Sequence, residues 1–370
     1  MDSATAIRVS RILRPSELTD EDLERWRGLQ SAHPELDRPF FAPEWLNILE
    51  GASHQVEVAV LADDDGDRGF FPFHRSGAVL RAPGMRLCDF QGWIGAPDLA
   101  VVPESLLRSV GARVWRFDHL LARQAAAARH GWERQGSPTA DLSSGFDAYL
   151  ALHRSRGARW VSQIPHHARR LERDAGSLRF EVSSMDRGVL EQLLAWKKTQ
   201  RQRTHTLDPL DEAWAHRAVT ACLAVDEPGF GGLLSALYAG DDLVAAHLGL
   251  RSHGTLHLWF PAYNTVHERA SPGLILLYHL MRAAAERGIR RVDFGKGPEH
   301  FKTSWSTGAE EVAEGFVHRD RIGTLVNGAA YGARRWLRAT GVARRLQEPK
   351  RRIFSLGRRV RGTFGPARNP

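Results

Sequence analysis

The segment from Arg269 to Leu274 carries residues that could bind an anion. It reads, in order, Arg269-Ala270-Ser271-Pro272-Gly273-Leu274. Small residues and a glycine at the start of a helix leave backbone N–H groups uncovered beside the positive end of the helix dipole. The segment therefore suits a pyrophosphate, although most helix starts of this kind are ordinary caps.

A second polar segment follows a predicted strand near residues 289–294. It reads Asp293-Phe294-Gly295-Lys296-Gly297, and Glu299 and Lys302 come shortly after it. Sheets in α/β proteins place ligands just beyond the carboxyl ends of their strands. Asp293 could orient a base or bind an amine, or it could cap the glycine-rich turn. Lys302 could meet a phosphate and Glu299 could act as a second-choice base, although a solvated lysine and a helix-dipole partner are the ordinary alternatives.

His247 is the first candidate for a general base. It lies in a predicted strand from Leu243 to Arg251. Strand alternation puts it on the face opposite Ala246 and Leu248, whose apolar side chains are expected to face the core. Histidine titrates near neutral pH, as a base that accepts a proton from an amine should. A structural histidine bonded to the backbone is the competing interpretation.

These residues fall on a recognisable order of elements. Three strand-like runs, at residues 232–238, 243–251 and 255–262, are joined by short hairpin-type connectors. A helix at residues 272–287 and a strand at residues 289–294 follow. The order β-β-β-α-β predicts an antiparallel meander, a helix and a parallel return strand.

The first half of the chain is predicted to be mixed α/β, with a boundary near residues 142–155. A loop beginning Asp89-Phe90-Gln91-Gly92 could close a cleft between two halves, or be an ordinary loop. The second half begins with a basic helix from Ser162, which could cap it, to Ala175.

Charge and cysteine content narrow the function further. The net charge is +8, but residues 331–370 alone carry +11, so residues 1–330 sum to −3. This argues against a nucleic-acid binder with a basic folded body.

Cys88 and Cys222 have no CxxC spacing, so neither a disulfide framework nor a metal site is expected, which fits a reducing cytoplasm. No secretory signal or run long enough to span a bilayer is visible.

Five ordered segments carry a family resemblance. They are Ala245–Arg251, Leu256–Tyr263, Ser271-Pro272-Gly273, Asp293–Gly297 and Phe301-Lys302. Together they closely resemble the GNAT-superfamily acetyltransferases of the CelD-like type, which are associated with bacterial cellulose and exopolysaccharide biosynthesis. The resemblance spans about residues 35–320.

The resemblance implies an α/β fold of two tandem GNAT-like (acyl-CoA N-acyltransferase) domains with mixed β-sheets, similar in architecture to the FemAB-type transferases. We expect an N-terminal domain at residues 1–150, a C-terminal domain with the acyl-CoA site at 151–325, and a basic amphipathic tail at 326–370. The implied donor is acetyl-CoA or another acyl-CoA, the acceptor is an amine or a hydroxyl, and no metal is needed.

The resemblance also suggests roles for particular residues. Catalysis is assigned to His247 and Asp293. Donor binding is assigned to Arg269, Ser271, Gly273, Leu274 and Lys302. Acceptor binding is assigned to Tyr263, Trp259, Lys296, Glu299 and Asp89, with a core role an equal alternative for Trp259. The usual GNAT phosphate-binding loop has the pattern R/Q-x-x-G-x-G/A, and its second glycine is missing here. Phe301 stands where relatives often have a tyrosine that could act as the general acid, so the general acid is unassigned.

The expected function is a cytoplasmic, acyl-CoA-dependent N-acyltransferase that serves polysaccharide or envelope assembly on a small amine or sugar acceptor. The alternatives are a FemAB-like aminoacyltransferase that uses aminoacyl-tRNA and a non-catalytic accessory protein. The basic tail could hold the chain at the inner face of an anionic membrane or at a polysaccharide-synthesis complex, and a solvated tail is the alternative. No specific nucleic acid is expected as a partner.

Overall fold

The computed structural model describes residues 7–204, 208–297, 299–320 and 323. The described residues up to Val317 form one compact unit. The predicted tail at residues 326–370 lies outside the described residues. No helix in the described part of the chain is both long and apolar enough to cross a bilayer.

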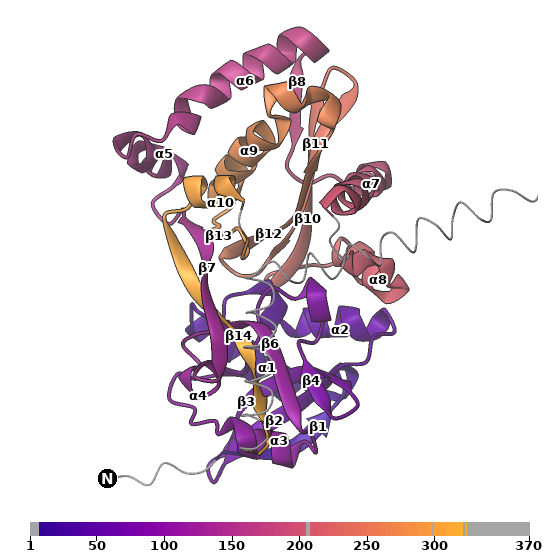
Figure 1. Cartoon of the computed structure of the whole chain (residues 1–370), viewed down its shortest axis with the longest axis vertical. Coiled ribbons are helices and arrows are strands. Elements are labelled where there is room, and N and C mark those ends of the chain that lie inside the picture. Colours follow the sequence, from indigo (N-terminus) through magenta and orange to yellow (C-terminus); the bar gives the residue numbers. More distant parts are fainter. Residues whose placement is uncertain (1–6, 205–207, 298, 321–322, 324–370) are drawn as a thin grey trace, which may run out of the picture. The chain divides into compact units, whose positions relative to one another are not determined.

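A mixed sheet runs through this unit (Figure 1). Its strands, within the described residues, are β1 (Arg8–Leu13), β2 (Glu57–Asp63), β3 (Gly66–Ser76), β4 (Val79–Arg81), β5 (Ile94–Gly95), β6 (Val114–Leu121), β7 (Gly131–Asp141), β8 (Leu178–Glu181), β9 (Asp226–Glu227), β10 (Phe230–Ala239), β11 (Asp242–Arg251), β12 (Thr255–Tyr263), β13 (Arg291–Asp293) and β14 (Gly308–His318). The spatial order is β1-β2-β3-β4-β6-β14-β7-β13-β12-β11-β10-β8, with β5 beside β3 and β9 beside β10.

Helices lie between these strands. The α-helices in the described residues are α1 (Asp20–Ala32), α2 (Pro43–Gly51), α3 (Pro103–Ser109), α4 (Ala125–Ala128), α5 (Phe146–Ser155), α6 (Arg159–Ala175), α7 (Arg187–Thr204), α8 (Ala213–Cys222), α9 (Pro272–Glu286) and α10 (His300–Trp305). The short 3₁₀ helices are η1 (Pro15–Glu17), η2 (Pro39–Phe41), η3 (Met85–Leu87), η4 (Pro209–Asp211) and η5 (Thr265–Ala270).

The predicted β-β-β-α-β order is confirmed by β10, β11, β12, α9 and β13. The three strands form an antiparallel meander, and β13 returns parallel to β12. The tight connector between β10 and β11 places Gly240 at φ 58°, in the left-handed region that glycine tolerates. Local turn chemistry and strand alternation thus sufficed to predict this part of the fold.

β7 and β14 connect the two halves of the chain. β7 pairs with β13 on one side and with β14 on the other, and β14 lies beside β6 (Figure 1). The strand formed by residues 308–318 therefore lies among strands from the first 141 residues. The sheet continues across the boundary predicted near residue 150, and the division into domains at 1–150 and 151–325 stays a prediction.

Helices cover both faces of the β10–β12 meander. α9 packs on one face together with α6, and α7 packs against β11 and β12 on the other. The α7 side shares one apolar core with residues from the N-terminal half, among them Phe40 and Trp45. Core packing therefore fixes the N-terminal half against the strands that carry the site described below.

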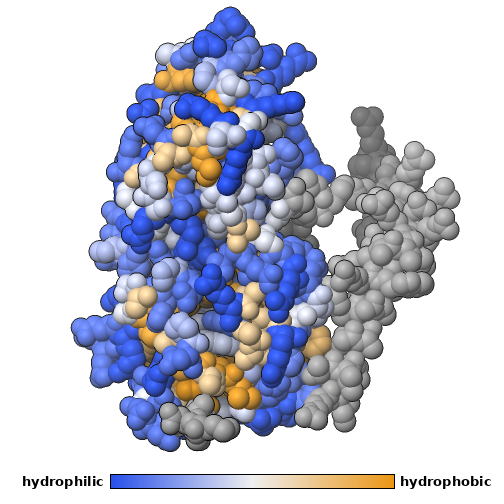
Figure 2. Space-filling view, turned by 90° about the vertical axis from the view of Figure 1, so that its left-hand side faces the viewer, coloured by the Kyte–Doolittle hydropathy of each residue, from blue (hydrophilic) through white to orange (hydrophobic). Residues whose placement is uncertain are grey.

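The basic helix α6 begins earlier than predicted. It starts at Arg159 with Ala158 in the cap position, so Ser162 lies inside the helix and its hydroxyl donates to the carbonyl of Arg159. The prediction of a Ser162 cap was therefore wrong, because an aromatic turn at Trp160 packs into the core and extends the helix backwards. The exposed side of α6 is polar, and Figure 2 shows a mostly hydrophilic surface on this side of the molecule.

Candidate active site

β12 and β13 pair over only three positions. The pairs are Thr255–Arg291, Leu256–Val292 and His257–Asp293. β13 ends at Asp293, whereas β12 continues to Tyr263. The two parallel strands therefore part immediately after His257 and Asp293, which places this pair at the point of divergence.

His257 lies between two carboxylates at this point. Its Nε2 atom is 2.9 Å from Asp89 Oδ2, and its Nδ1 atom is 3.6 Å from Asp293 Oδ1. The second distance is too long for a direct hydrogen bond, so that contact is an ion pair. Burial of the imidazole alone would lower its pKa, but the interactions with Asp293 and Asp89 outweigh burial and raise the pKa to about 9. His257 is therefore a cation at neutral pH; its Nε2–H donates to Asp89, and its Nδ1 has no hydrogen-bond partner among the described residues.

Asp293 is buried and fully engaged. It accepts from Arg38 Nη1 at 2.7 Å, from Ser137 Oγ at 3.0 Å and from the Gly295 N–H at 2.8 Å. Burial would raise its pKa, but His257 and the Arg38 guanidinium hold the pKa well below its usual range. These partners leave Asp293 in a positioning role toward His257.

Arg38 connects the N-terminal half to this site. Its side chain is buried, and its second nitrogen, Nη2, lies 3.3 Å from Glu310 Oε2. The guanidinium also stacks 4.4 Å over the ring of Phe90. Arg38 precedes η2, whose Phe40 ring meets His257 edge-on at 5.0 Å. One short segment thus supplies both a charge for Asp293 and an apolar wall for His257.

Asp89 is the more accessible carboxylate on His257. Its side chain is 28% exposed, whereas those of His257 and Asp293 are buried. Burial would raise its pKa, but the hydrogen bond from His257 and the nearby His119 lower it. Asp89 is therefore an ionised carboxylate that reaches solvent while His257 fixes its orientation.

Residues of β6 extend the cluster. Asp118 Oδ1 accepts from Gln91 Nε2 at 2.6 Å and from His119 Nδ1 at 3.0 Å. His119 Nε2 lies 3.9 Å from Asp89 Oδ1. Lys296 Nζ donates to the carbonyl of Asp118 at 2.9 Å. Lys296 and Asp89, both predicted to bind the acceptor, are therefore brought to one cluster.

The start of α9 forms a separate, cationic feature. Pro272 has no N–H, and the N–H groups of Leu274 and Ile275 bond to the carbonyl of Ser271. Gly273 is thus the residue of the first turn whose N–H could face an anion. A Cβ built at Gly273 would lie 3.2 Å from the Tyr263 ring, so a larger side chain would crowd this approach. Arg269 is exposed just before this turn.

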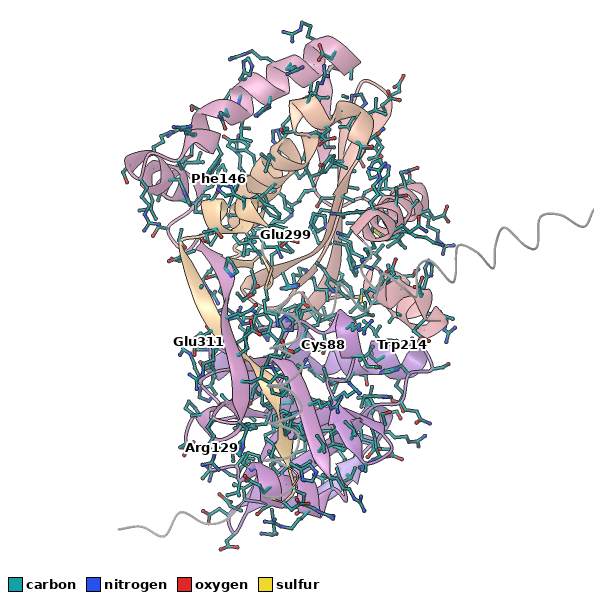
Figure 3. The ribbon with its side chains drawn as sticks, in the orientation of Figure 1. Cys88, Arg129, Phe146, Trp214, Glu299 and Glu311 are labelled. Atoms are coloured by element: carbon teal, nitrogen blue, oxygen red, sulfur yellow. The ribbon has the colours of Figure 1, made fainter. Side chains whose placement is uncertain are left out.

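Lys302 lies in the short helix α10 that follows β13, and its ammonium group is bonded there. Its Nζ atom donates to the Lys296 carbonyl at 3.2 Å and pairs with Glu299 at 3.1 Å. Figure 3 labels Glu299, together with Cys88, which precedes Asp89. Lys302 and Glu299 also act electrostatically on Lys197 of α7, whose pKa falls to about 8 because of burial and the nearby Arg201. The structure therefore groups Lys302 with α7 cations, apart from the predicted set at Arg269 and Gly273.

His247 does not join this cluster. It is 1% exposed, and neither ring nitrogen has a hydrogen-bond partner among the described residues. Burial, with the charges of His257 and Lys197, lowers its pKa to about 3. Both faces of β11 are buried, so the expected contrast between an apolar core face and the His247 face was wrong. The role of His247 as a base stays a prediction that its surroundings do not favour.

The two aromatic residues predicted near the acceptor lie in different environments. Trp259 is buried against Phe40 and Trp45, and its indole N–H donates to the carbonyl of Leu87 at 3.1 Å. Tyr263 is 39% exposed at the end of β12. Trp259 thus packs in the core, whereas Tyr263 lies beside the α9 start.

Comparison with known proteins bears on residues 158–303, which match the model of the acetyltransferase (GNAT) domain. This part of the chain is a GNAT domain. It contains β10–β13 and α9, together with His257, Asp293 and Arg269. Asp89 and Arg38 lie outside the matched residues, so the N-terminal half adds groups to a site centred on the GNAT domain.

Two solved structures share the fold over most of their lengths. FemX superposes with a TM-score of 0.54 at 11% identity, over 83% of this chain and 96% of FemX. The C-terminal domain (DUF2156) of a protein assigned as a lysylphosphatidylglycerol synthetase, from Agrobacterium fabrum, superposes with a TM-score of 0.51 at 13% identity, over 84% of this chain and 95% of that domain. At such identities the likeness concerns the fold alone. No curated protein matches the sequence.

The sequence patterns did not point to His257, Arg38, Asp118 or His119. His257 stands inside an apolar strand run, and Arg38 precedes an aromatic segment. The predicted β-α-β order offered a usable signal, because it implies that the two parallel strands, here β12 and β13, pair side by side. A charged residue on each of two parallel strands in a β-α-β unit can meet at the same register, as His257 and Asp293 do.

Proposed function

We propose that the chain is an acyl-CoA-dependent N-acyltransferase. The observation that carries this proposal is the position of the Asp89–His257–Asp293 group. It lies where β12 and β13 of the GNAT domain part, and Asp89 reaches solvent there. Acyl transfer to an amine requires a group that binds the amine next to the thioester of the bound donor.

The start of α9 suits the phosphates of an acyl-CoA. Arg269 supplies an exposed cation, Gly273 supplies a backbone N–H, and both lie at the positive end of a 15-residue helix. Gly273 also keeps the approach beside Tyr263 free of a Cβ. When bound, the thioester supplies the acyl group. Ser271 and Leu274 hold the turn through the hydrogen bond between them.

The acceptor amine is placed at Asp89. This carboxylate is ionised and partly exposed, so it can attract an ammonium group. His257 holds Asp89 in position through its Nε2–H, and Asp293, which Arg38 holds in place, keeps His257 a cation. The residues thus orient an amine and keep a fixed pattern of charge around it. Tyr263, Lys296 and Glu299 are proposed as further acceptor contacts.

We place the reaction in polysaccharide or envelope biosynthesis, with acetyl-CoA as donor and an amino sugar or amino-acid-like acceptor. The CelD-like pattern of the segments between Ala245 and Lys302 supports this assignment. The basic tail supports a site of action at an anionic membrane surface on the cytoplasmic side. Co-sedimentation of the full chain with anionic vesicles, and not with neutral ones, is the expected result. Equal recovery with both would remove the membrane tether.

Isothermal titration with acetyl-CoA tests the donor site. Wild-type chain is expected to bind, and Arg269→Ala to bind about tenfold more weakly through loss of a charge-assisted contact. Arg282→Ala is a matched control. Arg282 is also an exposed arginine, but it lies near the other end of α9, where it pairs with Glu286. Absence of binding up to millimolar acetyl-CoA and longer acyl-CoAs would overturn the proposal.

Aminoacyl transfer is the second candidate. Two observations favour it: the first turn of α9 offers few backbone donors to a pyrophosphate, and a structure of similar fold is assigned as a lysylphosphatidylglycerol synthetase. Transfer of an amino acid from aminoacyl-tRNA, in the absence of acyl-CoA binding, would replace the first proposal by this one.

A further inference from the structure

Asp118 and Gln91 lie beside Asp89 and have no role in the function proposed above. Asp118 is at the middle of β6, and Gln91 is in the loop that begins with Asp89. Gln91 is held in register by its backbone, since its N–H donates to the carbonyl of His119 and its carbonyl accepts from Leu121. The position of its carboxamide is therefore fixed by the N-terminal sheet.

The Gln91 carboxamide leaves an acceptor unused. Its Nε2 donates to Asp118 Oδ1 at 2.6 Å, which settles the orientation of the amide, because a carboxylate can only accept. The Oε1 atom is buried, with the residue 5% exposed, and has no partner among the described residues. A buried carbonyl oxygen without a donor costs free energy, so its retention points to a donor brought by a ligand.

Two carboxylates, those of Asp118 and Asp89, lie near this carboxamide. The Asp118 side chain is 49% exposed, and its hydrogen-bond donors are a carboxamide and an imidazole. Asp89 is 28% exposed and shares one oxygen with His257. The ammonium group of Lys296 donates to the Asp118 carbonyl and lies 3.8 Å from Glu314 Oε2. Arg38 and Arg123 are already paired with carboxylates, Arg38 with Asp293 and Glu310 and Arg123 with Glu310.

We propose that Asp89, Gln91 and Asp118 form a subsite for a primary ammonium group of the acceptor. Two carboxylates supply charge and the Gln91 carbonyl supplies a third acceptor, which matches the three N–H donors of an ammonium. His119 links the carboxylates through its two ring nitrogens and positions them. The acceptor therefore arrives as a cation, and neutral hydroxyl or N-acylated compounds are excluded. This inference rests on the proposed function, because it assigns that function's acceptor.

Ethylammonium is the probe, because any site for a primary ammonium should take the simplest one. We would titrate full-length protein with ¹⁵N-labelled histidine and follow the imidazole signals of His119 and His257. Ethylammonium chloride is expected to shift these imidazole signals in a saturable way. Sodium chloride or ethanol at equal concentration is expected to cause no such shift. Gln91→Met and Asp118→Asn are each expected to weaken binding about tenfold. Asp98→Asn, which changes an exposed acid elsewhere, should leave it unchanged.

Three results would overturn the subsite. They are no saturable shift with ethylammonium, the same shift with sodium chloride, and unchanged affinity in both Gln91→Met and Asp118→Asn. Asp118→Asn keeps the test valid if Gln91→Met fails to fold, because Asp118 is half exposed. Titration of the same samples with acetyl-CoA separates the two proposals. Acetyl-CoA binding without ethylammonium binding rejects the subsite alone, and the reverse rejects the acyl-CoA function alone.

Discussion

The imidazole of His257 and the carboxylate of Asp89 are joined by a 2.9 Å hydrogen bond, although 168 positions separate them in the chain. Asp293, opposite His257 in the parallel register of β12 and β13, completes the group. The contact links a loop of the N-terminal half to the centre of the GNAT domain. Stability and chemistry are therefore expected to depend on the same three side chains.

His257 should make stability depend on pH in the alkaline range. Its folded-state pKa of about 9 lies above the ordinary value of 6.5. The stabilisation is therefore fully present below pH 6.5 and is lost as pH rises through 9, by about 3 kcal/mol in total. Urea unfolding at pH 6.5 and 9.5 measures this loss. His257→Gln should flatten the dependence, and His253→Gln, at an exposed histidine, should retain it. If the free energy of unfolding falls equally between pH 6.5 and 9.5 in wild type and in His257→Gln, the assigned ion pairs of His257 are contradicted.

Removal of Arg38 should leave the buried Asp293 carboxylate with one cationic partner, His257, in place of two. Arg38 and Asp293 are both buried and lie 2.7 Å apart. Arg38→Met is expected to lower the free energy of unfolding by about 3–5 kcal/mol. Asp293→Asn added to Arg38→Met should cost less than the sum of the two single changes, because the uncompensated charge is gone. Chemical denaturation of the four proteins gives the coupling energy, and a single-variant cost below about 1 kcal/mol would count against the pair.

His247 offers a contrasting test. Both of its ring nitrogens are buried without partners in the described part of the chain, and its pKa is lowered to about 3. His247→Met removes these unsatisfied groups and should change the free energy of unfolding by no more than about 1 kcal/mol. Amine acylation should persist in this variant and fall sharply in His257→Met. Loss of turnover in His247→Met, with acetyl-CoA binding intact, would restore His247 as the base.

Gly273 should matter for donor binding more than for stability. A Cβ at this position would crowd the exposed ring of Tyr263, which can move aside, and would stand over the backbone N–H at the start of α9. Gly273→Val is expected to weaken acetyl-CoA binding about tenfold or more while the thermal midpoint changes by only a few degrees. Gly51→Val is a suitable control, because no atom lies within 4 Å of a Cβ built at Gly51. Unchanged binding in Gly273→Val would argue against donor phosphates at this turn.

Local sequence patterns predicted the meander, the α9 start and Asp293, because turns, alternation and strand ends are properties of neighbouring residues. They could not predict the partners of Asp293. Arg38 lies 255 positions away from it, and the residues around Arg38 read as an aromatic core segment. His247 was predicted as the base and His257 was not considered, because alternation along one strand carries no information on which histidine has charged neighbours. Long-range register, set by β7 and β14, decides that question.

Amine-dependent release of the CoA thiol from acetyl-CoA is the measurement that tests the central claim most directly. We would run it with a thiol reagent across amino sugars and amino acids, for wild type and Asp89→Asn. Wild type is expected to release thiol with at least one amine, and Asp89→Asn to lose about a hundredfold or more in kcat/KM while still binding acetyl-CoA. Acetyl-CoA binding with no amine-dependent release by wild type would contradict the enzyme and favour an accessory protein. Equal rates for wild type and Asp89→Asn would contradict the site.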